Sequence, residues 1–181
     1  MYKEFRIHVF GASGSGATTL AKALSVNYHF QFIDTDDIFW EPTDPPFTKK
    51  RATHDSFCKL KSLLDQNKRA VVSGAFVGWG DNLKPLFDLF VFMHIPIEIR
   101  LERIKLRERH RFKDRVLPGG DLYQQHLDFL DWVSQYESGD LNMRSKAQHE
   151  AWLKDVKVPI IRITEAMPLS AMLELIRPYF T

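Results

Sequence analysis

Short apolar runs alternate with amphipathic segments along the whole chain. Each apolar run is of a length that suits a buried strand and ends at glycine, proline or polar residues. Between the runs, apolar residues recur at intervals of three and four, as they do on one face of a helix. Strands are therefore predicted at residues 5–10, 30–33, 70–74, 89–95 and 158–163. Helices are predicted at residues 18–27, 54–66, 97–111, 144–156 and 169–179, and another after Asp121, its expected N-cap, with Leu122, Leu127, Leu130 and Val133 on one face.

This alternation of strands and helices predicts an α/β fold in three layers, with a five-stranded parallel sheet covered on both faces. Ligands bind such a sheet beyond the carboxyl ends of its strands. Residues 11–19, 34–37 and 73–81 each follow a predicted strand, so we expect them to converge. Residues 112–156 contribute no strand and are expected to form a helical lid on a single domain that spans residues 1–181.

Composition narrows the class of protein. The chain has 181 residues, an apolar fraction of 44% and a net charge of +2, which is too small to indicate a nucleic-acid or membrane partner by itself. The longest apolar run, residues 86–99, is interrupted by Asp88, His94 and Pro96, so no membrane span is predicted. Cys58 is the only cysteine, which favours a reducing, cytoplasmic setting, and it is expected to pack in the core. The histidines lack the spacing of a zinc site.

The first predicted strand runs into a glycine-rich stretch, Gly11-Ala12-Ser13-Gly14-Ser15-Gly16-Ala17-Thr18-Thr19. The order of a glycine, four residues, a glycine, one residue and then Ser or Thr is that of a phosphate-binding P-loop. Glycines allow backbone N–H groups to turn toward a phosphate, and the following helix adds the positive end of its dipole. Ala17 stands where such loops carry lysine. The alternative is a strand-to-helix turn whose glycines only permit tight packing.

The glycine stretch, the sheet order that it implies and the helix after the fourth strand resemble the P-loop nucleoside monophosphate kinase superfamily, which includes adenylate kinase-like and shikimate kinase-like enzymes. Four motifs carry a closer resemblance within it. They are the glycine stretch, Asp34-Thr35-Asp36-Asp37, Gly78-Trp79-Gly80 and the segment from Arg115 to Asp121. The closer resemblance is to a bacterial group of adenylate kinase-like proteins whose loop also lacks the lysine. The resemblance covers almost the whole chain. It implies the P-loop NTPase fold with strand order 2-3-1-4-5, and ATP and Mg²⁺ as cofactors.

Nucleotide contacts are expected along the loop. The predicted cofactor-binding residues are Gly11, Ser13, Gly14, Ser15, Gly16, Ala17, Thr18 and Thr19. In the superfamily the hydroxyl at the position of Thr18 helps to hold Mg²⁺, so Thr18 and Asp34 are predicted at the metal; a helix N-cap is the alternative for Thr18. Ser73 stands where a Walker-B-like carboxylate would end the third strand.

Arginines are expected to replace the missing lysine. Arg100, Arg103, Arg107 and Arg111 recur at spacings that place them on one stripe of a helix. The resemblance implies that Arg103 lies against adenine and that Arg107 contacts phosphates, while Arg107 and Arg111 are predicted to be catalytic. A solvated face balanced by glutamates is the alternative. Lys22 lies one helical turn from Ala17 and cannot simply take its place.

The acceptor is expected beside the second strand. Asp36 is predicted to lie near the substrate and to accept a proton from the acceptor. Further candidates are Trp40, Lys49, Arg51, Trp79 and Asp81, although both tryptophans also suit the edge of a core. The sequence therefore predicts a phosphotransferase that moves the γ-phosphoryl group of ATP to a small hydroxyl or phosphate acceptor, with a nucleotide as one candidate. A nucleotide-binding module or a weak NTPase is the alternative, and the acceptor and the oligomeric state stay open.

Overall fold

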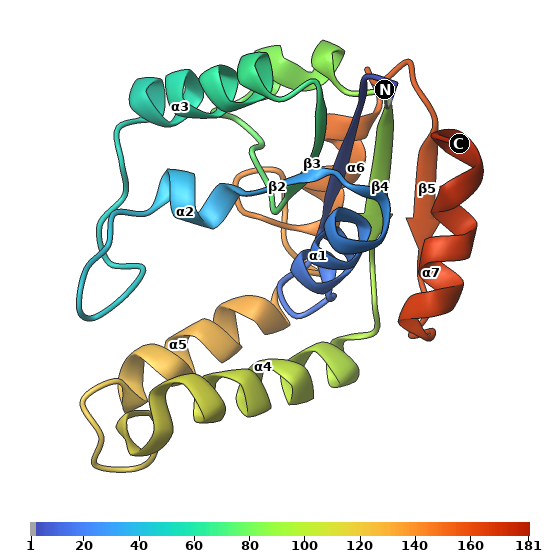
Figure 1. Ribbon diagram of the computed structural model, residues 1–181. Coiled ribbons are helices and arrows are strands. Elements are labelled where there is room, and N and C mark those ends of the chain that lie inside the picture. Colours follow the sequence, from blue (N-terminus) through green and yellow to red (C-terminus); the bar gives the residue numbers. More distant parts are fainter. Residues whose placement is uncertain (1–2) are drawn as a thin grey trace.

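The computed structural model describes residues 3–181 and has the predicted three-layer architecture (Figure 1). Five parallel strands form one sheet in the order β2-β3-β1-β4-β5, as predicted. The strands are β1 (Phe5–Gly11), β2 (Gln31–Asp34), β3 (Arg69–Ser73), β4 (Leu89–Met93) and β5 (Ile160–Ile163). The central strands β1 and β4 are almost entirely buried because helices cover both faces.

Helices connect the strands. They are α1 (Ala17–Tyr28), α2 (Thr35–Phe39), α3 (Thr53–Gln66), α4 (Ile97–Phe112), α5 (Tyr123–Ser134), α6 (Lys146–Leu153) and α7 (Leu169–Ile176). Three short 3₁₀ helices, η1 (Asp81–Leu86), η2 (Lys113–Val116) and η3 (Arg177–Tyr179), complete the described part of the chain. No helix within residues 3–181 combines the length and the apolar character that crossing a bilayer requires.

The two faces of the sheet have different cores. On one face, α1 and α7 pack aliphatic side chains such as Leu20, Leu24 and Ile176 against the strands. On the other face, α3, α6 and η1 enclose an aromatic cluster. His8 lies within this cluster, its ring centroid 4.6 Å from that of Phe10 and 4.3 Å from that of Phe76.

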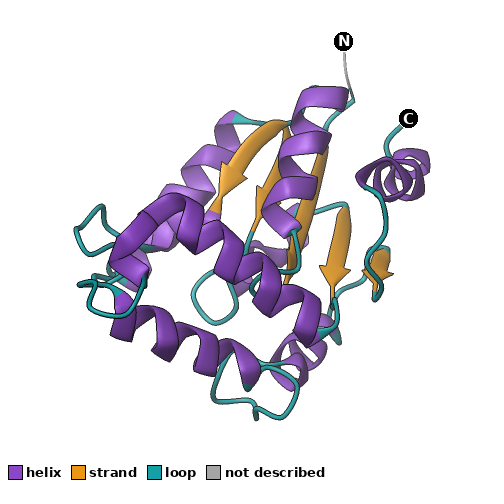
Figure 2. Cartoon of the chain, turned by 90° about the horizontal axis from the view of Figure 1, so that it is seen from below, coloured by secondary structure: helices purple, strands orange, loops and turns teal. Residues whose placement is uncertain are grey.

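Helices α4 and α5 extend away from the sheet, whereas α6 packs on it through Trp152 and Leu153. Helices α4 and α5 lie side by side at the carboxyl ends of the strands, as both views of the ribbon show (Figures 1 and 2). This arrangement places them over the glycine-rich turn and over α2. We call residues 112–145 the lid segment; the lid predicted from the sequence extends to residue 156 and so includes α6, which packs on the sheet.

Three local predictions are wrong. Cys58 is exposed, because the buried positions of α3 are Ser56, Leu60 and Leu64 and Cys58 lies on the opposite side of the helix. Asp121 does not cap α5, because its carboxylate accepts hydrogen bonds from Arg115 and Leu122 occupies the N-cap position. The helix predicted at 144–156 begins later, at Lys146, because the Ser145 hydroxyl accepts a hydrogen bond from the Gln148 N–H and caps it.

Candidate functional site

The glycine-rich turn between β1 and α1, together with the first residues of α1, is the candidate phosphate loop, and we call residues 11–19 the phosphate loop. It lies against the start of α4. A Cβ atom on Gly14 would lie 2.6 Å from the backbone oxygen of Arg100, so only glycine fits there without displacing α4. Gly16 is the N-cap of α1 and has a φ of 97°, which is the left-handed region that glycine tolerates best. The glycines therefore fix both the path of the loop and its distance from α4.

Helix α1 begins without a side-chain cap. Its first intrahelical bond runs from the Leu20 N–H to the Gly16 oxygen, and no side chain within the described residues caps the N–H groups that precede it. These groups carry the positive end of the helix dipole. An uncapped helix start behind a glycine loop is an arrangement that binds anions such as phosphate.

Two hydroxyl groups meet at the carboxyl end of β3. Thr18 Oγ1 lies 2.9 Å from Ser73 Oγ, within hydrogen-bonding distance. Ser73 is completely buried and pairs in register with Asp34 on β2. Thr18 and Asp34, the two residues predicted at the metal, therefore lie on elements that both adjoin Ser73.

These oxygen donors fit Mg²⁺ better than a transition metal. Mg²⁺ is held in nucleotide sites by one or two protein oxygens together with water and phosphate. Within residues 3–181 there is no group of three or more His, Cys, Asp and Glu side chains that could hold a metal by itself. A cation here would need the phosphates of a bound nucleotide as further ligands, which agrees with a hydroxyl beside a single nearby carboxylate.

Asp34 caps α2 and has a shifted pKa. Its carboxylate caps α2 by accepting a hydrogen bond of 3.1 Å from the Asp36 N–H. Burial raises its pKa to about 6, against the opposing effect of that hydrogen bond, and the charges of Asp36 and Asp37 raise it further. A bound cation would reverse this desolvation penalty by favouring the charged carboxylate.

The predicted arginine stripe on α4 divides into residues with different surroundings. Arg100 is completely buried, and its guanidinium donates to the backbone oxygens of Ile95 and Ser13 and to the Glu137 carboxylate. It therefore holds the phosphate loop from behind. Arg103 is exposed and donates from Nη1 to the Ser15 backbone oxygen at 3.2 Å.

The other two arginines of the stripe lie farther along α4. Arg107 is exposed, one helical turn beyond Arg103. The guanidinium of Arg111 lies 5.1 Å from the centre of the Phe47 ring. Phe47 belongs to the loop of residues 40–52, which we call the proline loop. In this structure Arg111 therefore packs against the proline loop.

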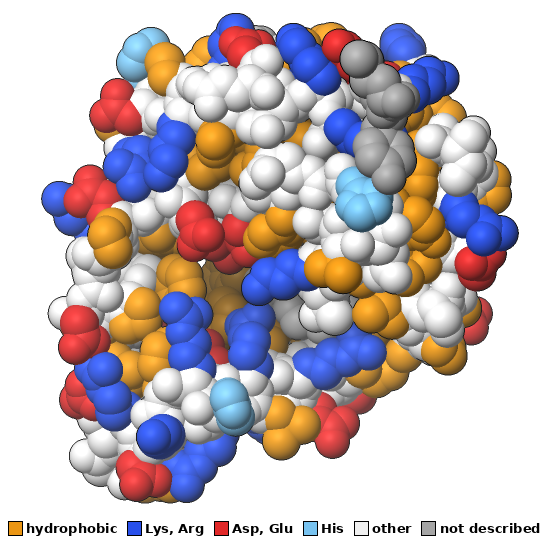
Figure 3. All heavy atoms as spheres, viewed as in Figure 1, with side chains coloured by type: hydrophobic (Ala, Val, Ile, Leu, Met, Phe, Trp, Pro, Cys, Tyr) orange, Lys and Arg blue, Asp and Glu red, His pale blue; other side chains and the backbone are white. Residues whose placement is uncertain are grey.

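A hollow separates α2 from α4 and α5 on the face shown in Figure 3. Acidic side chains gather on the rim over α2, and Lys and Arg side chains gather on the rim over α4 and α5. The acidic rim suits a metal or a proton acceptor, and the basic rim suits an anionic ligand. The hollow thus has a negatively charged rim at α2 and a positively charged rim at α4 and α5.

The predicted acceptor residues do not all face this hollow in the same way. Asp36 is exposed in the first turn of α2. Trp79 stacks on Phe39 with ring centroids 5.9 Å apart, which agrees with the expectation of a tryptophan at the edge of the core. Asp81 accepts hydrogen bonds from the Gly78 N–H at 2.8 Å and from the Trp152 indole at 2.6 Å, so it braces the Gly-Trp-Gly loop.

The remaining acceptor candidates belong to the proline loop. Arg51 donates from Nε to the Ile38 backbone oxygen at 2.8 Å and thereby holds the end of α2. Trp40 packs edge-on against Phe39 and Phe47. Lys49 pairs with Glu41 at 2.7 Å.

Arg144 was missed in the sequence analysis. It is half-buried, and its guanidinium lies 5.7 Å from the centre of the Trp132 ring. Burial lowers its pKa, and the charge of Asp36 opposes that change. The sequence did contain a signal for Arg144 as a site residue: it is an arginine next to Ser145, the N-cap of α6, within a segment predicted to be a lid.

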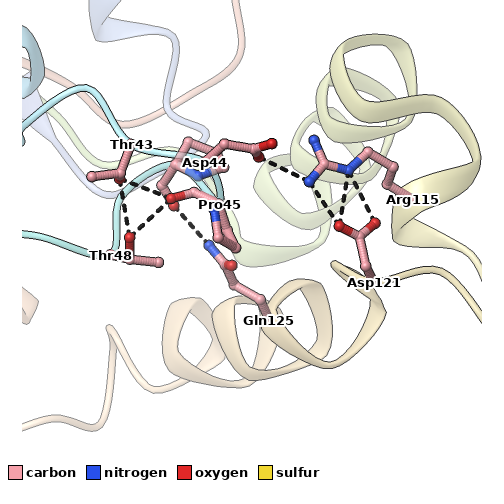
Figure 4. A network of polar contacts seen from close by, with 8 residues as sticks. Thr43, Asp44, Pro45, Thr48, Arg115, Asp121 and Gln125 are labelled. Carbon is pink, nitrogen blue, oxygen red and sulfur yellow. Dashed lines mark hydrogen bonds and ion pairs between the residues drawn. The ribbon is translucent and has the colours of Figure 1, made fainter.

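The lid segment contacts the proline loop through polar groups (Figure 4). Arg115 donates to Asp121 at 2.7 Å and to Asp44 at 2.8 Å, and so joins the two segments. Gln125 of α5 donates to the Pro46 backbone oxygen at 2.9 Å. The ion pairs that connect the lid segment to the proline loop thus involve side chains that are largely exposed.

Comparison with known sequences identifies relatives of this chain. No family model matches the chain. It is 40% identical over 175 residues to the uncharacterized protein YqaC of Bacillus subtilis (strain 168), and the match covers 97% of each chain. The chain belongs to the same family as YqaC. It is also 26% identical over 151 residues to a cytidylate kinase of Methanoregula boonei, covering 77% of this chain and 80% of that enzyme.

Comparison with solved structures confirms the fold. A shikimate kinase from Acinetobacter baumannii in complex with shikimate has a TM-score of 0.55 at 20% identity, covering 98% of this chain and 95% of that one. A shikimate kinase from Bacteroides thetaiotaomicron also has a TM-score of 0.55, at 16% identity, covering 96% and 98%. The predicted α/β/α fold of P-loop kinases is therefore correct.

Proposed function

We propose that this member of the YqaC family is a P-loop kinase that binds Mg-ATP and transfers its γ-phosphoryl group to a small acceptor in the hollow between α2 and α4. The observation that carries the proposal is the uncapped start of α1 behind the phosphate loop, beside the Thr18 and Ser73 hydroxyls and the Asp34 carboxylate. The kinase fold and the similar cytidylate kinase support the same reading.

The phosphate loop would hold the nucleotide through its backbone. The N–H groups of residues 13–19 and the dipole of α1 attract the phosphate chain without the need for a side chain. Thr18 and Asp34 would hold Mg²⁺, which when bound neutralises charge on the phosphates. Arg107 would contact the transferring phosphoryl group from the opposite rim, with Arg111 available once it leaves Phe47.

Asp36 and Arg144 would serve the acceptor. Asp36 is exposed at the start of α2, where it can accept a proton from an attacking hydroxyl. Arg144 offers a planar fork of donors that matches a phosphate or carboxylate group on the acceptor. The lid segment, as part of a single domain that spans the chain, would exclude water once the acceptor is bound, in a cytoplasmic setting.

A panel of acceptors assayed for ADP release tests this proposal. It should include cytidine, uridine and adenosine monophosphates and shikimate, with Mg-ATP as the donor. Release of ADP only with a particular acceptor, abolished in Thr18→Ala and preserved in Ser170→Ala on the exposed part of α7, would support the kinase. Hydrolysis that is independent of every acceptor would contradict it.

A second function is favoured by Ala17. Since the loop lacks the lysine that such loops use, the chain could bind nucleotide without appreciable turnover. Mg-ATP would then raise the melting temperature although no acceptor releases ADP. Absence of a shift with every nucleoside triphosphate would contradict both functions.

A further inference from the structure

We propose that Arg103 supplies the positive charge that the phosphate loop lacks at position 17, by binding the phosphate chain of the nucleotide and not by packing on its base. This inference rests on the proposed binding of Mg-ATP. It departs from the sequence-based expectation that Arg103 lies against adenine while Arg107 contacts phosphates.

A full side-chain charge would add to the partial charges of the loop backbone, and position 17 does not provide one. A nucleoside triphosphate brings several negative charges to the loop, and backbone N–H groups contribute only partial charges. Ala17 has a methyl group at the position from which a lysine would reach the outer phosphates. A cation that supplies this charge would therefore come from elsewhere in the chain.

Arg103 already lies on the loop. Its Nη1 donates to the Ser15 backbone oxygen at 3.2 Å, and the same atom lies 3.7 Å from the point that a Cβ on Gly16 would occupy. Gly16 directly precedes Ala17 and is the N-cap of α1. The guanidinium thus lies beside the N-terminus of the helix toward which the phosphates are drawn.

The backbone beneath Arg103 is held in place. One turn earlier, the side chain of Arg100 is completely buried and its backbone oxygen lies against Gly14. Arg103 itself is exposed, and a guanidinium carries five N–H donors, of which the bond to Ser15 uses one. The remaining donors can reach phosphate oxygens without giving up the contact that positions the group.

The other nearby cations are directed elsewhere. Lys22 lies over the ring of Phe32 at 5.5 Å, on the side of β2. Arg100 is bonded to two backbone oxygens and to Glu137, and Arg111 lies over Phe47. Among these cations of the described chain, Arg103 is the one that combines a hydrogen bond to the phosphate loop with an exposed guanidinium.

A ligand without a base separates the two roles of Arg103. Binding of Mg-ATP, Mg-tripolyphosphate and adenosine would be measured by isothermal titration calorimetry for the wild type and for Arg103→Met. We expect Arg103→Met to weaken both phosphate ligands about tenfold or more, as the loss of a charge-assisted bond to phosphate does, and to leave adenosine unaffected. Lys105→Met, which removes an exposed cation from the same helix, should change none of the three.

A rescue variant completes the test. If Arg103 acts in place of the lysine, Ala17→Lys introduced into the Arg103→Met protein should recover most of the lost affinity for Mg-tripolyphosphate. Arg103→Lys should fall between the wild type and Arg103→Met, because it keeps the charge and loses the planar fork.

Two results would overturn the inference while leaving the proposed function intact. One is a loss of affinity for Mg-ATP and adenosine with none for Mg-tripolyphosphate, which would place Arg103 against the base. The other is wild-type affinity of Arg103→Met for all ligands. If the wild-type protein binds neither Mg-ATP nor Mg-tripolyphosphate, the proposed function itself fails and the inference with it.

Discussion

Arg100 and Arg115 are both arginines of ion pairs, yet they belong to regions built in different ways. Arg100 supports the phosphate loop, with a side chain that is 0% exposed and bonded to two backbone oxygens as well as to Glu137. Arg115 joins the lid segment to the proline loop, with a side chain that is 39% exposed and with partners, Asp121 and Asp44, that are 59% and 72% exposed. The buried contacts of Arg100 are therefore expected to be permanent, and the exposed contacts of Arg115 to be reversible.

This difference agrees with what a kinase would require of the two regions. A phosphate site works best when its donors are already in place, because no reorganisation is then needed during the reaction. An acceptor site must open to admit its ligand and close to exclude water. Exposed ion pairs contribute little to stability, so contacts like those of Arg115 can break and re-form easily.

The largest effect is expected from Arg100→Met. Removing a buried guanidinium leaves the Ser13 and Ile95 oxygens without their donor and Glu137 without its partner, so we expect a loss of about 3 kcal/mol in the free energy of unfolding. For a chain of this length that corresponds to a fall of roughly 6–12 °C in melting temperature. Arg109→Met, which breaks the exposed pair with Asp114, is the matched control and should change the melting temperature little. Equal shifts for both variants would remove the distinction between the two regions.

A pair of glycine substitutions should give the next largest difference. Gly14 and Gly119 both have positive φ, of 80° and 87°, but a Cβ on Gly14 meets the Arg100 backbone oxygen and one on Gly119 meets nothing within 4 Å. Gly119→Ala should therefore cost about 1 kcal/mol for the backbone conformation alone. Gly14→Ala should cost about 3 kcal/mol, because overpacking adds to that strain. Chemical denaturation of both variants measures the difference, and equal costs would show that α4 yields to the loop.

Acid should destabilise the sheet region through its buried histidines. Burial lowers the pKa of His8 and of His149 to about 3, although a hydrogen bond to the Gly74 oxygen partly opposes this for His8. The unfolded chain therefore binds more protons than the folded chain from about pH 6.5 downward, and stability falls as the pH falls through that window. Each histidine should contribute a slope of about 1.4 kcal/mol per pH unit.

The control for this slope is His8→Phe, whose ring can still stack on Phe10 and Phe76. Its unfolding free energy, measured between pH 6.5 and pH 5, should vary less steeply than that of the wild type by the contribution of one histidine. An unchanged slope would mean that His8 is protonated in the folded protein.

The smallest effect is expected from Arg115→Met. The loss of its exposed pairs should lower the free energy of unfolding by less than about 1 kcal/mol, and 1 M NaCl should remove even that difference by screening. Hydrogen exchange should nevertheless be faster in residues 113–122 of the variant, because the lid segment would separate from the proline loop more often. Unchanged exchange in that segment would show that Arg115 does not hold it closed.

The features predicted correctly from the sequence are those with a local cause. The sheet follows from its short apolar runs, and the tight turn into α1 follows from the glycines between Gly11 and Gly16. Phosphate binding by that turn stays a prediction. The strand order came from the resemblance to P-loop kinases and is confirmed, whereas the lid segment was expected because that stretch contributes no strand.

Features set by contacts between distant segments were predicted poorly. Helical spacing placed Arg100 and Arg103 on one stripe but could not indicate that Arg100 is buried behind Ser13, some 87 positions away in sequence. Asp121 has the side chain of an N-cap, yet Arg115 takes its carboxylate. Arg144 was missed because its surroundings, Trp132 and Asp36, come from separate segments of the chain.

The uncapped start of α1 has a consequence for the rate at which the protein is degraded. A phosphate bound there would provide the acceptors that no side chain supplies, so the filled protein would be more stable than the empty one by an amount that grows with ligand concentration. Proteases act on the unfolded fraction of a protein. The amount of this chain would then follow the supply of its ligand: molecules that are empty for long would be degraded first, without any separate signal for their removal.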